Sequence, residues 1–124
     1  MALEKQWEMV RLLVERTEAG DVTWKPTAAD DAFQVSFRNY SLLLSKVSES
    51  NSRDPDFVIS LINEDGVVAE SFSDVELYHS CGPFPEGASP PFKAMENLFE
   101  LARRQASGAD KIIDEILLQL RAPF

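Results

Sequence analysis

The chain has 124 residues, of which 44% are hydrophobic and 27% are charged, so its composition is that of a soluble globular protein and we expect one domain over residues 1–124. A single cysteine excludes an intrachain disulfide and favours a reducing compartment. No apolar run approaches the ~20 residues that span a bilayer, and no signal peptide is recognisable. We therefore expect a cytoplasmic protein with no membrane partner.

The net charge of −9 is concentrated in the middle of the chain. Residues 49–90 contain nine acidic residues and one basic residue, whereas the segments on either side are almost neutral. Lys and Arg make most contacts to nucleic-acid phosphates, so this acidic segment argues against DNA and RNA as partners. It suits a basic protein partner, or it serves only to keep the protein soluble.

The first predicted element is a helix from Leu3 to Glu18, because apolar residues recur there at steps of three and four. Gly20 is expected to end it. Residues 22–25 predict a short strand that Pro26 ends, since proline is tolerated at a strand end or a sheet edge.

Two further strands are indicated before residue 48. Phe33, Val35 and Phe37 alternate with polar residues, which is typical of a strand with one dry face and one wet face. A third strand is expected from Tyr40 to Val47, and a polar loop from Ser48 to Pro55.

The strongest local signal is a β-hairpin, in which two β-branched apolar runs flank a turn that contains glycine. A type I turn that begins at Asn63, with Gly66 in the left-handed position, places Leu61 opposite Ala69. We prefer this register to the alternative that places Leu61 opposite Glu70, because the alternative sets an apolar side chain against a charge.

The preferred register makes both faces of the hairpin apolar. One face carries Phe57, Ile59, Leu61, Val67 and Ala69. The other face carries Val58, Ile62, Val68 and Phe72, together with Ser60 and Glu70. Since one helical layer covers one face, we predict that the second face is a partner interface, most simply of a homodimer, formed by Val58, Ile62, Val68, Phe72 and Glu70. Alternatively, the C-terminal helices and the Pro-rich loop cover it within one chain.

After the hairpin, Val75, Leu77 and Tyr78 are expected to extend the fifth strand or to begin a sixth. Residues 81–91 contain four prolines and two glycines, which prevent any regular element.

The C-terminal part predicts a helix that begins at Ser89 or Pro90 and ends at Gly108. Its apolar stripe is Phe92, Met95, Leu98, Phe99, Ala102 and Ala106. Asp110 is expected to cap a second helical piece that Pro123 ends. One face of that piece carries Ile113, Ile116, Leu117 and Leu120. The predicted fold class is therefore α+β, with an N-terminal helix, an antiparallel meander of about five strands, and one broken or two C-terminal helices packed on one sheet face.

No set of residues identifies a catalytic, cofactor or metal site. His79 and Cys81 would project to the same side of a strand, but no third orienting group is recognisable, so we interpret them as an incidental pair. One His and one Cys are too few for a structural zinc site. The acidic segments 54–56 and 63–65 lack the spacing of a calcium loop and are interpreted as solvated turns.

The spacing of Leu13, Thr17, Gly20 and Trp24, followed by a strand meander and a helical tail that contains Ala102 and Arg103, resembles a family of small bacterial cytosolic proteins with no assigned activity. This resemblance implies a fold and transfers no catalytic or binding residue, because the shared residues are packing and turn residues. In size and acidity the chain is also similar to secretion chaperones and to immunity proteins that neutralise toxins.

These observations lead to one functional expectation and one alternative. We expect a non-enzymatic module for protein–protein contact that is accessory, chaperone-like or immunity-type and that forms a homodimer. The alternative is a small-ligand-binding module or enzyme with a pocket between the sheet and the C-terminal helices, near Tyr78, His79 and Cys81.

Overall fold

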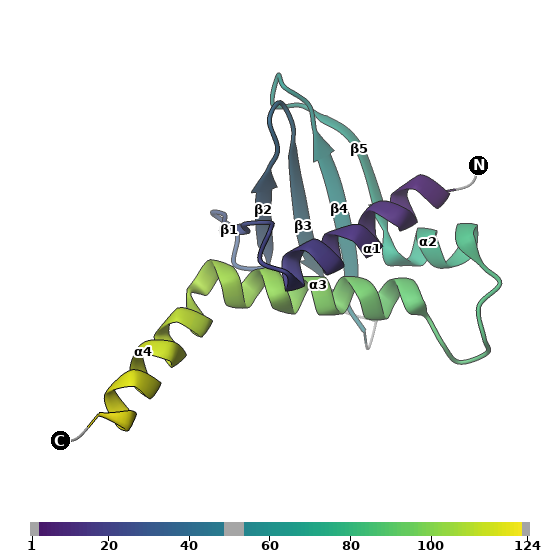
Figure 1. Ribbon diagram of the computed structural model, residues 1–124. Helices are drawn as coiled ribbons and strands as arrows, with labels where there is room; N and C mark the ends of the chain where they lie inside the picture. The colour runs from purple at the N-terminus through teal and green to yellow at the C-terminus, as the bar shows by residue number, and fades with distance from the viewer. Residues whose placement is uncertain (1–2, 49–53, 123–124) are drawn as a thin grey trace.

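The computed structural model describes residues 3–48 and 54–122, so most of the expected 48–55 loop and the expected helix stop at Pro123 lie outside the described residues. Within them, one helix precedes a five-stranded antiparallel sheet and three helices follow it (Figure 1). The elements are α1 (Glu4–Glu18), β1 (Lys25–Pro26), β2 (Ala32–Ser36), β3 (Ser41–Val47), β4 (Asp56–Ile62), β5 (Val68–Ser73), α2 (Asp74–Cys81), α3 (Pro90–Ser107) and α4 (Ala109–Arg121). The predicted α+β class and the meander are confirmed.

Helix α1 is confirmed to within one residue of its predicted bounds. Val10, Leu13 and Thr17 lie on one face and are buried, where α1 packs against α2 and α3. Gly20 follows the helix with a φ of 80°, a left-handed conformation that glycine adopts without a steric penalty.

The β1 edge of the sheet, which contacts α3, differs from the prediction. Pairing with β2 begins at Lys25, so the short strand expected at 22–25 is displaced toward Pro26. Trp24 explains the displacement, because its indole is buried in the core and its backbone N–H donates to the side chain of Gln105 in α3. Phe37, predicted to share the dry face of a strand with Phe33 and Val35, lies beyond the end of β2 and is exposed.

The turn between β4 and β5 has the predicted geometry. The Gly66 N–H donates to the Asn63 carbonyl over 3.0 Å, and the φ of Gly66 is 81°. The Asn63 side chain also accepts hydrogen bonds of 3.0 Å from the N–H groups of Asp65 and Val67. The Asn63 side chain thus supplies the acceptor that these two backbone N–H groups need, and it stabilises the shape of the turn.

The register predicted beyond this turn is wrong. Leu61 lies opposite Glu70, because Ala69 is an extra residue that the sheet accommodates in a β-bulge. The shift by one residue places Phe72 opposite Ile59 in the core, where it is 2% exposed. Burial of such a side chain contributes ~1.5–3 kcal/mol, and the predicted register would have placed Ser71 there instead.

Residues 74–81 form a helix, so the predicted extension of the fifth strand, or a sixth strand, is wrong. A capping box starts the helix. The Ser73 hydroxyl accepts a 3.2 Å hydrogen bond from the Glu76 N–H, and the Glu76 carboxylate accepts one of 3.2 Å from the Ser73 N–H. Both otherwise unpaired donors are thereby satisfied, and Leu77 is buried on the inner side of α2.

Helix α3 lies across the sheet, and α1 lies beside it (Figure 1). Helix α3 begins at Pro90, one of the two predicted starts, and Ser89 caps it, with its hydroxyl accepting a 3.3 Å hydrogen bond from the Phe92 N–H. The buried residues of its predicted stripe include Met95, Leu98, Phe99 and Ala102. From β4, Phe57 packs against the rings of Phe92 and Phe99, each with a centroid distance of 5.6 Å. The core therefore lies between α3 and one face of the sheet.

Candidate functional site

His79 and Cys81 do not project to the same side of one element. The prediction that they share a side required a strand, but both residues lie on the helix α2. Residues two apart on a helix point to nearly opposite sides. His79 is exposed, and its ring contacts Tyr78 edge-on. Burial raises the pKa of Cys81, and the nearby Glu4 carboxylate adds to this effect, which disfavours the thiolate form.

The acidic turns behave as structural elements. Asn63 and its neighbours form the hairpin turn described above, and Asp56 begins β4. Across residues 3–48 and 54–122, no three His, Cys, Asp or Glu side chains lie close enough together to hold a metal ion.

A cleft of about 580 Å³ lies between the start of β4, α2 and the start of α3. Its lining includes Asp56, Asp74, Tyr78, Phe92 and Lys93. Tyr78 therefore lines a pocket near the expected place, whereas the lining does not include His79 or Cys81.

Asp74 has a structural role at this cleft. It is 4% exposed, and its Oδ1 accepts a 2.8 Å hydrogen bond from the Phe57 N–H, which joins the start of α2 to β4. Burial raises its pKa, and the nearby carboxylate of Asp56 adds to the rise.

The sheet face away from α3 retains part of the predicted partner interface. Val58, Ile62 and Val68 share this face with Leu43 and with several serines, because they alternate with the buried residues of β3 and β4. The placement of Phe72 there is wrong, since the bulge turns it into the core.

The placement of Glu70 on this face is also wrong. Glu70 pairs with Leu61 and lies on the side of the sheet that faces the helices, where its carboxylate accepts a 2.9 Å hydrogen bond from Gln6 of α1. An interface role for Val58, Ile62 and Val68 stays a prediction.

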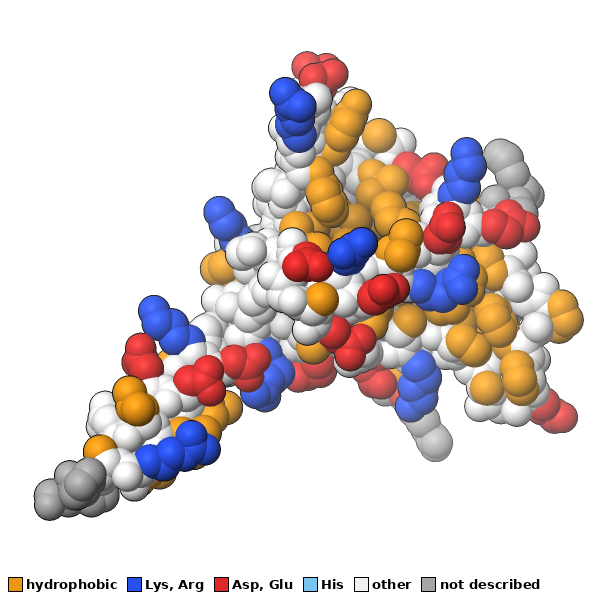
Figure 2. All heavy atoms as spheres, in the orientation of Figure 1, with side chains coloured by type: hydrophobic (Ala, Val, Ile, Leu, Met, Phe, Trp, Pro, Cys, Tyr) orange, Lys and Arg blue, Asp and Glu red, His pale blue; other side chains and the backbone are white. Residues whose placement is uncertain are grey.

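The most exposed apolar surface of an element is on α4. None of its residues is buried, and among the described elements it lies against α3 alone. Its large apolar side chains are between 37% and 71% exposed. They are Ile112, Ile113, Ile116, Leu117, Leu118 and Leu120. Hydrophobic and charged side chains alternate along this helix at the lower left of Figure 2.

Five of these six side chains form one face. Successive helical residues are rotated by roughly 100°, which places Ile112, Ile113, Ile116, Leu117 and Leu120 within an arc of about 140°. Leu118 lies on the opposite, charged side. Surface helices usually bury an apolar arc of this width against another element, so α4 has the pattern of a packed helix in an exposed position.

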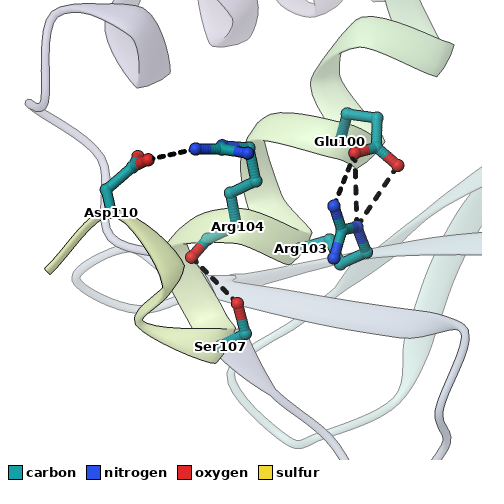
Figure 3. Close-up of polar contacts among 5 residues, drawn as sticks. All are labelled: Glu100, Arg103, Arg104, Ser107 and Asp110. Carbon is teal, nitrogen blue, oxygen red and sulfur yellow. Dashed lines mark hydrogen bonds and ion pairs between the residues drawn. The ribbon is translucent and has the colours of Figure 1, made fainter. Parts of the chain in front are cut away.

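Helix α4 extends away from the body (Figure 1), and polar contacts join it to α3 (Figure 3). Gly108 ends α3 with a φ of 71°, and the Ser107 hydroxyl donates to the Arg104 carbonyl over 3.1 Å. The Arg104 guanidinium binds the Asp110 carboxylate across the joint. Asp110 therefore does not cap α4 as predicted: Gly108 occupies the cap position, and Asp110 links the two helices.

Arg103 makes a separate contact within α3. Its guanidinium lies 2.9 Å from the Glu100 carboxylate, and these hydrogen bonds lower the pKa of Glu100. The neighbouring arginines thus have different roles, because Arg103 stays on α3 and Arg104 reaches α4 (Figure 3).

A second apolar area lies where α1 leaves the sheet uncovered, and it appears above α1 in Figure 2. A cleft of about 300 Å³ there is lined mainly by Met9, Leu12, Leu13, Val22 and Phe37. The sequence does not predict this area, because its pattern places Phe37 on the dry face of a strand. The apolar face of α4 was recognisable from its spacing, but the spacing does not show what it contacts.

Comparisons of the chain with protein-family models, curated proteins and solved structures find no match. Among the helices of the described residues, none is both long and apolar enough to cross a membrane. The surfaces of the molecule therefore carry the information on its function, and α4 is the candidate site.

Proposed function

We propose that this protein is a non-enzymatic interaction module, of the accessory, chaperone-like or immunity type, and that it acts as a homodimer. The observation that carries this proposal is α4, a helix with a complete apolar face and no buried residue. Contiguous exposed apolar surface of this kind usually marks a protein-interaction site. The Arg104–Asp110 ion pair and Gly108 support a defined position for this helix.

We further propose that the protein is cytoplasmic and that its acidic surface meets a basic protein partner. The net charge of −9 supports this part, and carboxylates such as Glu64 and Asp65 at the tip of the hairpin are exposed. Complementary charge mainly accelerates encounter, so binding of this partner should weaken in about 0.5 M salt, where charges are screened beyond roughly 4–5 Å.

A pull-down tests the function. The wild-type full chain and two α4 variants are each immobilised on a solid support, and the proteins that they retain are compared. Ile116→Asp places a charge in the apolar arc, whereas Leu118→Asp places the same charge on the opposite side. Neither side chain is buried, so both variants should fold. We expect proteins from a lysate of the source cells, or added copies of the chain, to be retained by wild type and by Leu118→Asp but lost by Ile116→Asp. Equal retention by all three contradicts the proposal.

A small-ligand-binding module or enzyme is the second candidate, favoured by the 580 Å³ cleft beside Tyr78 and Phe92. A thermal-shift screen against metabolites and metal ions separates the candidates, because a ligand that binds the folded chain raises its melting temperature. A shift that Tyr78→Ala abolishes, together with the absence of any retained protein, would favour the second candidate.

A further inference from the structure

We propose that α4 pairs antiparallel with α4 of a second copy of this chain, with a two-fold axis beside Ile116 and Leu117. This inference rests on the proposed function and names the partner and the geometry of its site. Three features of the described residues carry it: the width of the apolar arc, the order of charges along its edge, and the direction in which α4 leaves the body.

The width of the apolar arc requires a partner surface. An arc of about 140° is wider than the narrow seam of a two-residue heptad pattern and resembles the inner face of a bundle helix. In the proposed pair, Ile113 of one copy faces Leu120 of the other, and the Ile116 and Leu117 side chains meet at the axis. The five apolar residues of each helix then lie against those of its mate.

The charges along one edge of this arc have opposite signs at the two ends of α4. In an antiparallel pair, the acidic end of one copy therefore lies beside the basic end of the other. Asp110 and Asp114 lie at this edge near the start of α4, and Arg121 lies at the same edge at its end. With the axis beside Ile116 and Leu117, each Arg121 lies between the two acids of the other copy. A parallel pair would instead bring Asp114 close to Glu115 of its mate and leave Arg121 without an acid.

These groups are available for such contacts. Within residues 3–48 and 54–122, Asp114, Glu115 and Arg121 take part in no ion pair, and Asp110 binds Arg104 through Oδ1. A carboxylate accepts several hydrogen bonds, so Asp110 can hold Arg104 of its own chain and Arg121 of the mate together. The joint that positions α4 would then become part of the interface.

The shape of the molecule favours the same arrangement. Helix α4 extends away from the sheet and from α1, and its C-terminal end is the point farthest from them in Figure 1. An antiparallel pair places the two bodies at opposite ends of the helices, whereas a parallel pair would crowd them at one end. A lipid surface is a poorer occupant, because the polar side carries three acids and two bases, and anionic lipids attract basic helices.

The size of the contact sets the expected affinity. A helix of 13 residues is ~20 Å long, so two such helices bury less than the roughly 800 Å² per partner of a standard interface. We therefore expect a dissociation constant in the micromolar range.

Sedimentation velocity of the full chain from about 1 to 200 μM measures this association directly. We expect Ile116→Asp to raise the dissociation constant at least about tenfold and Leu118→Asp to leave it unchanged. Arg121→Glu should weaken the dimer by about fivefold through its two symmetric sites, and the double variant Asp114→Lys with Arg121→Glu should recover part of this loss. A monomer at all concentrations, or a dimer insensitive to Ile116→Asp, overturns the pairing.

Disulfide trapping tests the direction of the helices. In a Cys81→Ser background, the single variants Ile113→Cys and Leu120→Cys are prepared. Each variant is oxidised alone, and an equal mixture of the two is oxidised in parallel. In an antiparallel pair two copies of residue 113 are about 10 Å apart along the axis, so the mixture should cross-link and each variant alone should not. Efficient cross-linking of each variant with itself would indicate parallel helices and overturn the proposal. If sedimentation and disulfide trapping both show no pairing of α4, but the immobilised chain still retains a different protein through α4, the proposed function stands without this dimer.

Discussion

At the scale of single residues, Asp74 shows how a carboxylate can be structural and still carry a cost. Its Oδ1 accepts the Phe57 N–H over 2.8 Å and thereby fixes α2 to β4. The same burial that makes this hydrogen bond strong raises the pKa of the side chain, because a buried carboxylate loses its hydration. Ionised Asp74 is therefore less stable in the folded chain than in the unfolded chain.

The stability contributed by Asp74 should depend on pH with a defined sign. Because its folded pKa is raised, this contribution is fully present below the unfolded pKa near 3.8 and is lost as the pH rises through the folded pKa. Asp74→Asn keeps an oxygen acceptor and cannot ionise. We expect the free energy of unfolding of this variant, relative to wild type, to be higher at about pH 7 than at about pH 4.

Urea unfolding followed by tryptophan fluorescence measures this difference. Asp74→Ala is the control for the hydrogen bond, since it leaves the Phe57 N–H buried without its acceptor and should cost about 1–3 kcal/mol. A constant difference between wild type and Asp74→Asn across this pH range would show that the ionisation of Asp74 does not affect stability.

At the scale of elements, three separate segments meet at Trp24. Its indole N–H donates to the Thr17 hydroxyl of α1 over 3.0 Å, and its backbone N–H donates to Gln105 of α3. Gln105 in turn donates to the Val22 carbonyl over 2.9 Å. The spacing of Thr17, Gly20 and Trp24 is thus explained by packing and by a turn.

Replacing Thr17 by valine should separate this polar link from simple packing. The two side chains have similar shapes, but valine leaves the buried indole N–H of Trp24 without an acceptor, which should cost about 1–3 kcal/mol of stability. Thr23→Val is a matched control, because Thr23 is exposed and its replacement should change stability by less than about 0.5 kcal/mol. Chemical denaturation measures both, and equal effects would mean that the hydrogen bond contributes nothing.

Periodicity predicted α1, α3 and the apolar face of α4 because each has a stripe at helical spacing, and Asn63 with Gly66 predicted the hairpin turn. The register was missed because its bulge falls at Ala69, a residue with no preference for such a position. The α2 helix was missed although Ser73 and Glu76 have the spacing of a capping box. Spacing alone does not reveal whether a stripe is covered, so the exposure of α4 was not predictable.

At the scale of the whole molecule, the apolar surfaces outside the core include α4 and the sheet face with Val58, Ile62 and Val68. If α4 joins two copies, the sheet face stays available for a different protein. The serines among its apolar residues make this face less apolar than the arc of α4. The two surfaces can therefore be tested independently.

Val58→Lys is expected to affect the second surface alone. Val58 lies on the face away from α3, so the variant should fold and should keep the α4-dependent association seen by sedimentation. Binding of any protein to the sheet face should fall at least about tenfold, as expected for a charge buried without a counter-ion. Loss of self-association in Val58→Lys would instead place the contact between copies on the sheet, as the sequence predicted.

The order of the strands has a consequence for the way the chain reaches its native state. Each strand pairs with the next one along the chain, so the sheet is made from local contacts that form quickly. Helix α1 is different, because its main packing partner α3 lies near the other end of the chain. During synthesis α1 leaves the ribosome before α3, and its apolar stripe stays uncovered until α3 has followed, so we expect closure of the helical layer to be a late step of folding.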